Sequence, residues 1–431
     1  MIQMTIDEIY KVFKSSNGVC TDTRQIRPND LFIALKGPNF NANEFASKAI
    51  DLGACFAIID DPAYATEKTI LVSDGLSCLQ DLARLHRSKL NYPIIGLTGS
   101  NGKTTTKELI SSVLSQMYKV RSTSGNLNNH IGVALTVLSF DSNLDFGIIE
   151  MGANHQKEIE FLCTIAQPDF GLITNFGKAH LEGFGGVEGV IKGKSELYDF
   201  IRNNGKTAFI NGDDPKQIKQ IGNYENVVTF GTSYTVDYRI RLLSSDPYVK
   251  LQYKNELIES HLIGEYNFGN IAVAIAIGAH FELAPEKIKK GIENYQPDNN
   301  RSEILKKGSN QVILDAYNAN PTSMLAALKS FSKLEAANKY LFLGDMFELG
   351  EDSAMEHQAI VDYVEAHFEK HRYFIGSHFY NTTTNDPSVK FKSFEEAIDT
   401  IRSLSPENAH VFIKGSRGMA LERLVDYLNF R

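Results

Sequence analysis

The sequence has few cysteines, no long hydrophobic run and no excess of positive charge. Only four of its 431 residues are cysteine and none forms a CxxC pair, so we expect reduced thiols and no zinc site. No apolar run approaches the roughly 20 residues of a membrane helix, and the N-terminus lacks a basic and apolar signal, which predicts a cytoplasmic protein without a membrane span. The formal net charge of −8 argues against nucleic-acid binding.

The chain is long enough for two or three domains, and its 42% hydrophobic content is that of an ordinary globular protein. We predict three α/β domains with mostly parallel sheets, because short apolar strands alternate with helical patterns along most of the sequence. The predicted boundaries are residues 1–88 for a small N-terminal domain, 89–298 for a central domain and 299–431 for a Rossmann-like C-terminal domain. The last of these includes a predicted helix over residues 419–430.

A short apolar run at residues 94–97 leads into a glycine-rich loop and then a helical pattern. A strand, a glycine loop and a helix start in this order form a phosphate cradle of backbone N–H groups, supported by the positive end of the helix. A lysine can reach the outer phosphates, and a threonine hydroxyl can bind Mg²⁺. An ordinary glycine-rich turn is the alternative, but the strand and the helix favour ATP binding. The predicted ATP-binding residues are Thr98, Gly99, Ser100, Asn101, Gly102, Lys103, Thr104 and Thr105.

Three polar clusters of the middle region belong to the edge of the predicted parallel sheet, where ligands collect. They comprise residues 125–129, residues 150–155, which begin at Glu150 on a strand end, and residues 175–183. A carboxylate at the end of a buried strand is costly unless it is paired or bound to a cation. Taken singly, His180 is more typical of a structural histidine, and Lys194 of a solvated helix lysine.

These motifs, taken in order, resemble the Mur amide ligases of bacterial peptidoglycan synthesis along essentially the whole chain. The shared features are the loop at 98–104, the strand end at Glu150, the run from Asn175 to His180, and Asn267 with Asn270. Residues 125–132, 150–155, 180–185, 315–321, 344–350 and 414–417 resemble the branch that adds D-alanyl-D-alanine (D-Ala-D-Ala). The resemblance implies that ATP phosphorylates a carboxylate of UDP-N-acetylmuramoyl-tripeptide (UDP-MurNAc-tripeptide), and that the D-Ala-D-Ala amine then displaces phosphate.

The resemblance also implies the roles of individual residues. Lys103 is expected to bind the β- and γ-phosphates, and two Mg²⁺ sites are expected from Thr104, Glu150, His180 and Lys194. In this family the lysine matched by Lys194 is carbamylated by CO₂, which converts it into an anionic oxygen donor. The nucleotide contacts implied for adenine, phosphate and ribose are Asn267, Asn270, Arg301 and Asp315.

The remaining implied contacts are to the two other substrates. The resemblance assigns the uridine nucleotide to the N-terminal domain, the muramyl-peptide to the middle domain and the dipeptide amine to the C-terminal domain. The residues concerned are Thr23, Arg24, Asn128, Asn154, His155, Asn318, Asn320 and Arg417. We expect a monomer that closes its last domain over ATP, and no general base for the amine is identifiable.

Three alternatives differ in substrate or in class. A sister Mur ligase that adds the third amino acid shares the ATP core, but its usual Asp-Asn-Pro-Arg run is absent from this sequence. A folylpolyglutamate synthase shares the same core. A nucleotide-binding protein without catalysis predicts missing phosphate or metal groups, whereas Lys103, Thr104, Glu150, His180 and Lys194 are all present.

Overall fold

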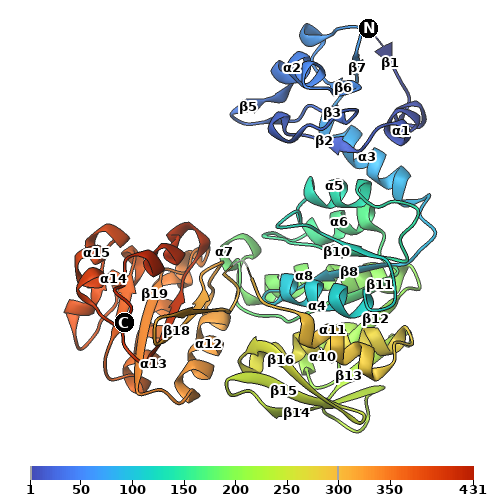
Figure 1. Ribbon diagram of the computed structural model, residues 1–431. Coiled ribbons are helices and arrows are strands. Elements are labelled where there is room, and N and C mark those ends of the chain that lie inside the picture. Colours follow the sequence, from blue (N-terminus) through green and yellow to red (C-terminus); the bar gives the residue numbers. More distant parts are fainter. Residues whose placement is uncertain (1, 299) are drawn as a thin grey trace.

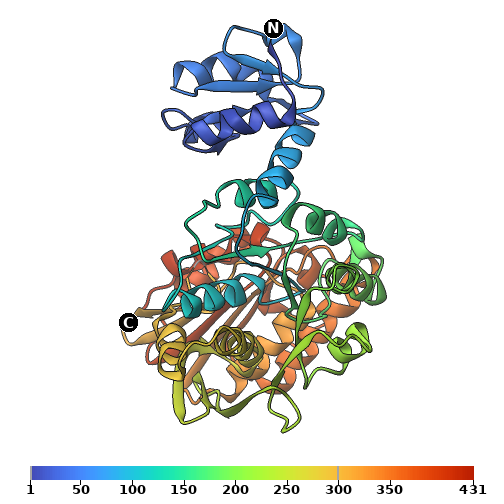
Figure 2. The same cartoon turned by 90° about the vertical axis from the view of Figure 1, so that its right-hand side faces the viewer.

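The computed structural model describes residues 2–298 and 300–431, which form three α/β units, each built around its own sheet (Figure 1). The N-terminal unit stands apart from the other two and is joined to the central unit through helix α3 (Gly75–Arg87) (Figure 2). The fold class predicted from the sequence is confirmed. No helix in the described part of the chain has both the length and the apolar character needed to cross a membrane.

The N-terminal unit has a five-stranded parallel sheet in the order β1-β7-β6-β3-β2, with a small antiparallel hairpin of β4 and β5. Its strands are β1 (Ile2–Gln3), β2 (Val19–Cys20), β3 (Leu31–Ile33), β4 (Lys36–Gly37), β5 (Phe40–Asn41), β6 (Phe56–Ile59) and β7 (Thr69–Leu71). Its helices are α1 (Ile6–Ser15), α2 (Ala46–Asp51) and α3 (Gly75–Arg87), with 3₁₀ turns η1 (Thr23–Gln25), η2 (Ala42–Phe45) and η3 (Pro62–Tyr64).

Helix α3 connects the N-terminal unit to the central unit, where it packs on α5 (Gly132–Leu138) and α6 (Glu158–Ala166). His86 is buried. Its Nε2 atom lies 2.7 Å from the Phe140 carbonyl oxygen, and its Nδ1 atom lies 3.1 Å from the Tyr10 hydroxyl. Arg87 pairs with Asp169 at 2.7 Å and donates to two carbonyl groups at the end of α6. These contacts attach α3 firmly to the central unit, although the strands before it belong to the N-terminal sheet.

The central unit has a nine-stranded sheet in the order β16-β15-β14-β13-β12-β11-β8-β10-β9, parallel from β14 to β9. Strand β15 pairs in antiparallel fashion with both β14 and β16. Consecutive residues face opposite layers. Ile94 and Ile149 pack toward α5, α6 and α8 (Val187–Asn203), whereas Ile95 and Ile148 pack toward α4 (Lys103–Leu114) and α10 (Phe268–His280). The parallel strands are therefore buried on both faces.

The strands of the central unit are β8 (Ile94–Thr98), β9 (Val120–Ser122), β10 (Phe146–Glu150), β11 (Phe170–Ile173), β12 (Thr207–Asn211), β13 (Val227–Gly231), β14 (Tyr238–Ser244), β15 (Tyr248–Tyr253) and β16 (Glu256–Ile263). Its further helices are α4 (Lys103–Leu114), α7 (Leu181–Phe184), α8 (Val187–Asn203), α9 (Pro215–Ile221), the 3₁₀ turn η4 (Glu265–Asn267), α10 (Phe268–His280) and α11 (Pro285–Asn294).

The C-terminal unit has a six-stranded sheet in the order β17-β18-β22-β19-β20-β21, parallel except for the β17–β18 pair. Its strands are β17 (Glu303–Lys307), β18 (Asn310–Asp315), β19 (Asn338–Gly344), β20 (Arg372–Ile375), β21 (Lys390–Phe391) and β22 (Ala409–Lys414). Its helices are α12 (Pro321–Lys333), α13 (Ser353–His367), α14 (Ser377–Tyr380) and α15 (Phe394–Ser403), with 3₁₀ turns η5 (Gly350–Asp352), η6 (Pro387–Val389), η7 (Arg417–Met419) and η8 (Leu421–Asp426).

The helix predicted over residues 419–430 is wrong, because the structure has two short 3₁₀ segments there instead. Ala420 adopts a left-handed conformation with φ of 47° and separates η7 from η8. Leu421 and Leu424 are both fully buried, and their three-residue spacing is one turn of a 3₁₀-helix. The four cysteines, Cys20, Cys55, Cys78 and Cys163, are free thiols in this structure.

A buried histidine in the C-terminal unit makes its stability depend on pH. His357 is fully buried on α13, where Nε2 accepts a hydrogen bond from the Met346 N–H at 3.0 Å and Nδ1 donates to the Ser353 carbonyl at 2.7 Å. Burial lowers the pKa of His357 below its ordinary value of about 6.5, against the opposing effects of Ser353, Asp345 and Glu356.

We therefore expect the free energy of unfolding to fall as the pH drops below about 6.5. In that range the unfolded chain binds a proton at His357 that the folded state resists, so the stabilisation present at higher pH is progressively lost. Urea unfolding between pH 5 and 8 measures this free energy of unfolding. His357→Gln should flatten the pH dependence, whereas His367→Gln, at an exposed position of the same helix, should leave it unchanged; equal slopes in all three proteins would contradict the assignment.

Candidate active site

The glycine-rich loop connects the end of β8 to the start of α4, as predicted. Gly99 has a φ of 145°, and a Cβ there would lie 2.0 Å from the Thr174 hydroxyl oxygen. Gly102 has a φ of 78° at the N-terminus of α4, and a Cβ there would lie 2.5 Å from the Asn270 side-chain oxygen. The loop can therefore adopt its close packing only with glycine at these two positions.

A buried carboxylate lies opposite the first residues of α4. Glu150, at the end of β10, is 2% exposed and accepts hydrogen bonds from the Thr104 hydroxyl at 2.9 Å and the Asn128 amide at 2.8 Å. Lys103 donates to the Gly99 carbonyl at 2.7 Å. Burial lowers the pKa of Lys103, which Glu150 opposes and Arg301 reinforces. A bound anion would therefore stabilise the charged form of Lys103.

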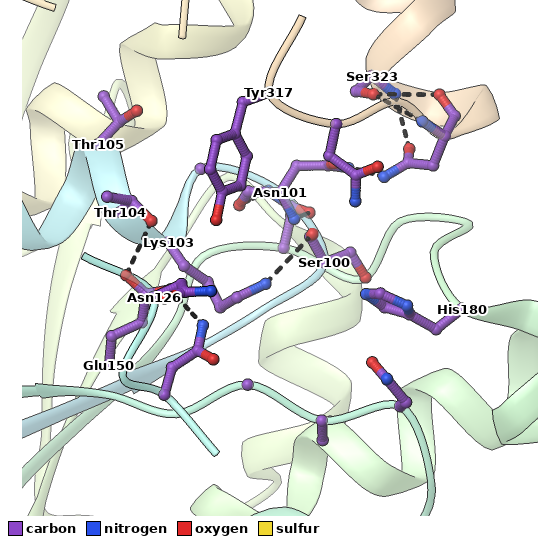
Figure 3. Close-up of a pocket in the computed structure, with 18 of the residues that line it drawn as sticks. Ser100, Asn101, Lys103, Thr104, Thr105, Asn126, Glu150, His180, Tyr317 and Ser323 are labelled. Carbon is purple, nitrogen blue, oxygen red and sulfur yellow. Dashed lines mark hydrogen bonds between the residues drawn. The ribbon is translucent and has the colours of Figure 1, made fainter. Parts of the chain in front are cut away.

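The loop opens into a cavity of about 1000 Å³ that the central and C-terminal units line together. Figure 3 shows Lys103, Thr104 and Glu150 on one side and Tyr317 and Ser323 on the opposite side, with His180 pointing toward the loop. Most predicted site residues line this cavity: Ser100, Asn101, Gly102, Lys103, Thr104, Thr105, Asn128, Glu150, Asn154, His180, Asn267, Asn270, Arg301, Asp315, Asn318 and Asn320.

The predicted adenine pair forms a hydrogen-bonded chain at the start of α10. The Asn270 amide donates to the Asn267 side-chain oxygen at 2.8 Å, and Asn267 donates to the Ile263 carbonyl at 2.9 Å. The Asn270 oxygen also accepts from the Thr106 hydroxyl at 3.0 Å. Both side chains are therefore fixed against α4, beside the phosphate loop.

The C-terminal unit brings several charged groups to the same cavity. Asp315 at the end of β18 pairs with Lys414 at the end of β22 at 2.6 Å. The Arg301 guanidinium lies 3.5 Å from the centre of the Tyr317 ring, and that of Arg417 lies 4.9 Å from it. Arg417 itself is exposed and is not among the residues that line the cavity. We did not single out Tyr317 and Lys414 from the sequence, although both lie in motifs that follow strand ends.

One hydrogen bond joins the phosphate loop directly to the C-terminal unit. Asn320 caps the N-terminus of α12, where its side-chain oxygen accepts from the Ser323 N–H at 2.9 Å. Its amide donates to the Asn101 side-chain oxygen at 2.7 Å. The C-terminal unit therefore contacts the phosphate loop through the cap of a 13-residue helix whose positive end faces the cavity.

Lys194 is fully buried on α8, so the solvated position expected from the sequence alone is wrong. Its amine donates to the Ala153 carbonyl at 3.0 Å and lies 4.9 Å from the centre of the Phe184 ring. Burial, with a further contribution from Lys103, places the pKa of Lys194 well below its ordinary range. It lies behind Ala153, which lines the cavity, whereas Lys194 itself does not.

Besides Arg417 and Lys194, five predicted residues do not line the cavity: Thr23, Arg24, Thr98, Gly99 and His155. Thr98 is buried at the end of β8, and its hydroxyl has no hydrogen-bond partner within residues 2–298 and 300–431. Arg24 is exposed in η1 of the N-terminal unit beside Thr23 and pairs with Asp22 at 2.7 Å. His155 is exposed and pairs with Glu158 at 3.2 Å. None of these side chains lines the cavity.

The residues around Glu150 fit a divalent cation whose other ligands come from phosphate and water. No three histidine, cysteine, aspartate or glutamate side chains within residues 2–298 and 300–431 lie close enough together to hold a metal. Glu150 nevertheless is a buried carboxylate, and among the described residues no basic side chain forms an ion pair with it. Mg²⁺ is typically bound in this way, by one or two protein oxygens plus substrate phosphates.

The fold and the cavity together define a P-loop nucleotide-binding enzyme with three α/β units. Residues 97–278 match the Mur ligase middle domain, and residues 300–417 match the Mur ligase, glutamate ligase domain. The UDP-N-acetylmuramoyl-tripeptide–D-alanyl-D-alanine ligase of Bacillus subtilis (strain 168) is 33% identical, over 99% of this chain and 98% of its own length. The chain therefore belongs to the Mur ligase family.

Two solved structures show how far the likeness extends. The crystal structure of MurF from Acinetobacter baumannii superimposes with a TM-score of 0.86 at 29% identity, covering 99% of this chain and 98% of that one. MurF of Thermotoga maritima in complex with ADP gives a TM-score of 0.84 at 23% identity, covering 97% and 98%. The Thermotoga maritima structure shows the shared fold, and the Acinetobacter baumannii structure is similar in both sequence and fold.

Proposed function

We propose that this protein is the ATP-dependent ligase that joins D-Ala-D-Ala to UDP-MurNAc-tripeptide and forms the UDP-MurNAc-pentapeptide of peptidoglycan synthesis. The observation that carries the proposal is the similarity to ligases of this name over 99% of the chain. The geometry supports it, because one cavity of about 1000 Å³ combines a phosphate-binding loop with residues of a second unit that can hold an acceptor.

In the first half of the reaction, a carboxylate oxygen of the tripeptide attacks the γ-phosphorus of ATP, and ADP leaves. Three negative groups meet in this step, so catalysis consists mainly of positioning and cationic stabilisation. We propose that Lys103 holds the β- and γ-phosphates and that the N–H groups of residues 99–105 surround them. Arg301 adds positive charge from the C-terminal unit.

We further propose that Thr104, Glu150 and His180 hold Mg²⁺ when ATP is bound. The cation would neutralise phosphate charge and polarise the phosphoryl group. Asn128 donates to Glu150, so it fixes the orientation of that carboxylate as well as facing the substrate cavity.

Lys194 fits a carbamate because burial lowers the pKa of its amine well below the ordinary range, which favours the neutral form. Only a neutral amine can attack CO₂; the nitrogen forms the new bond to carbon and releases a proton. We propose that the resulting anionic oxygens extend past Ala153 toward the second Mg²⁺ site. The same burial that disfavours an ammonium ion therefore favours this modification.

In the second half of the reaction, the D-Ala-D-Ala amine attacks the acyl phosphate, phosphate leaves, and the nitrogen loses a proton. We propose that Asn318, Asn320 and Arg417 receive the dipeptide. Asn154 and His155 are proposed to face the muramyl-peptide, while Thr23 and Arg24 belong to the uridine site of the N-terminal unit.

The proposed nucleotide contacts also come from both the central and the C-terminal unit. We propose that Asn267 and Asn270 contact adenine and that Asp315 contacts the ribose from the C-terminal unit. The corresponding domains are residues 1–88, 89–298 and 299–431. Because the reaction consumes ATP and a UDP-linked substrate, we propose that it takes place in the cytoplasm.

Phosphate release from ATP tests the function directly. Purified protein is incubated with ATP, Mg²⁺, UDP-MurNAc-tripeptide and a panel of amine acceptors, and the products are weighed by mass spectrometry. We expect phosphate release that requires both the tripeptide and D-Ala-D-Ala, with a pentapeptide product. Turnover with UDP-MurNAc-dipeptide and a free diamino acid would assign the protein to the sister reaction, and ATP binding without turnover on any pair would contradict an enzymatic role.

The Asn101–Asn320 contact predicts separate effects on stability and turnover. Asn320→Ala removes both the helix cap and the contact, so we expect a loss of about 1 kcal/mol in unfolding free energy together with lower kcat/KM. Asn320→Ser retains a capping oxygen but cannot reach Asn101, so stability should stay near wild type. Its kcat/KM should fall by roughly tenfold, equivalent to ~1.4 kcal/mol. Urea unfolding and steady-state kinetics measure the two effects, and wild-type kinetics for Asn320→Ser would contradict a role for the contact.

A further inference from the structure

A second set of contacts between the central and C-terminal units surrounds His180. The segment 177–182, which leads into α7, lies against the segment 345–350, which leads into η5 (Figure 1). The His180 Nδ1 is hydrogen-bonded to the Glu348 carboxylate, and the Glu182 N–H donates to the Glu348 carbonyl at 3.3 Å. Glu348 therefore contacts the central unit through both its side chain and its backbone.

Both partners of this contact have an unusual backbone conformation. His180 has a φ of 54° and Glu348 a φ of 62°, in the left-handed region that residues other than glycine rarely adopt. Such conformations persist only where the surrounding structure maintains them, and they are concentrated at functional sites. The two segments are thus shaped to bring the imidazole and the carboxylate together.

The segment that carries Glu348 is rigidly held within the C-terminal unit. The Met346 N–H donates to the buried His357 at 3.0 Å, and the Phe347 N–H donates to the Ser416 hydroxyl at 2.9 Å. These two hydrogen bonds fix the position of the Glu348 segment relative to the C-terminal sheet.

Docking of the two units does not depend on this pair alone. Lys178 forms an ion pair with Glu356, whose side chain is only 8% exposed, and the Lys178 N–H donates to the Thr322 hydroxyl at 2.9 Å. The Glu348 side chain is instead 51% exposed, and a solvent-exposed contact of this kind adds little to stability. The specific consequence of the Glu348 contact is the orientation of His180.

We propose that Glu348 is a positioning residue that orients His180 for a divalent cation, so that closure of the C-terminal unit completes the metal site. A metal-binding histidine commonly uses its other ring nitrogen to bond a carboxylate, which fixes both the ring orientation and the tautomer. Here Nδ1 is engaged by Glu348, which leaves Nε2 for the cation in the cavity toward which the ring points (Figure 3). The inference rests on the proposed function only in taking His180 as a metal ligand.

Metal binding can be measured without the ligase substrates. Mn²⁺ is titrated by electron paramagnetic resonance into the full-length protein with ADP and inorganic phosphate, and electron spin-echo modulation detects a coordinated histidine nitrogen. For wild type we expect a nitrogen signal that disappears in His180→Ala. Glu348→Gln should bind Mn²⁺ 10- to 100-fold more weakly, on the order found for outer-sphere partners, and its nitrogen signal should be reduced.

Two matched variants separate positioning from other effects. Glu351→Gln changes an exposed carboxylate three residues away and should leave Mn²⁺ affinity unchanged. Lys178→Met removes the Lys178–Glu356 ion pair between the units without touching His180, so its effect on Mn²⁺ affinity should be much smaller than that of Glu348→Gln. Small-angle X-ray scattering and circular dichroism check that the variants remain folded and equally closed.

The outcomes distinguish this inference from the function itself. Unchanged Mn²⁺ affinity and nitrogen signal in Glu348→Gln would overturn the positioning role, and so would an equal loss in Lys178→Met, which would reduce Glu348 to a docking contact. If Glu348→Gln fails to fold, Glu348→Ala and Glu348→Asp provide the same comparison. A wild-type protein that binds Mn²⁺ through His180 but fails to ligate D-Ala-D-Ala would contradict the proposed function and leave the inference intact.

Discussion

Lys103→Ala is expected to abolish ligation, with kcat lowered by at least about 10³-fold, the order of effect of a cation that stabilises phosphoryl transfer. The Lys103 amine lies 2.7 Å from the Gly99 carbonyl, within the loop that precedes α4. Residues 98–105 contain no other lysine or arginine. Loss of this charge removes the cation that we propose to hold the β- and γ-phosphates. Coupled phosphate-release kinetics and the mass of the product measure the effect.

The loss in Lys103→Ala should not come from unfolding. Burial already lowers the pKa of Lys103 in the absence of a bound anion, so removing the charge should leave thermal stability equal or slightly higher. Lys119→Ala, which changes an exposed lysine of the same unit, serves as the control and should retain full activity. Near-normal turnover by Lys103→Ala would disprove the assignment of the phosphate-binding loop.

Lys194→Ala is expected to be the second most damaging change, lowering kcat on the order of 10²-fold. If the amine carries a carbamate, its loss removes anionic oxygens that help to hold the second cation. Short carboxylic acids such as formate and acetate can supply such oxygens in the space left by the side chain, so they should partly restore turnover in a concentration-dependent manner. Steady-state rates with increasing acetate measure the rescue.

Two further variants make the Lys194 result interpretable. Lys192→Ala, at an exposed position of α8, should be fully active and unaffected by acetate. Lys194→Met fills the buried space without an amine and should be inactive, yet at least as thermally stable as wild type, because it removes a desolvated amine. Full activity of Lys194→Ala without any response to carboxylic acids would restrict Lys194 to a structural role.

Sequence patterns were sufficient for the features that depend on local chemistry. The phosphate loop was predicted from its glycines, lysine and threonine between a strand and a helix, and the structure has β8 and α4 at these positions. Helix α1 was missed, although its signal was present: Thr5 and Glu8 form a capping box just before an amphipathic segment. The failed helix at residues 419–430 shows the limit of periodicity, since a three-residue spacing of leucines also suits a 3₁₀ turn.

The sequence by itself therefore determined the class of most segments and the strand, glycine loop and helix of the proposed phosphate site, because turn geometry, helix capping and strand burial follow from neighbouring residues. Tertiary structure alone decided what those residues contact. Lys194 is spaced like a solvated helix lysine but is buried by packing, and Asn128 meets Glu150 only because strand β10 lies beside its loop. The Asn101–Asn320 and His180–Glu348 contacts join residues 219 and 168 positions apart. Such pairs depend on how whole units dock, which no local pattern specifies.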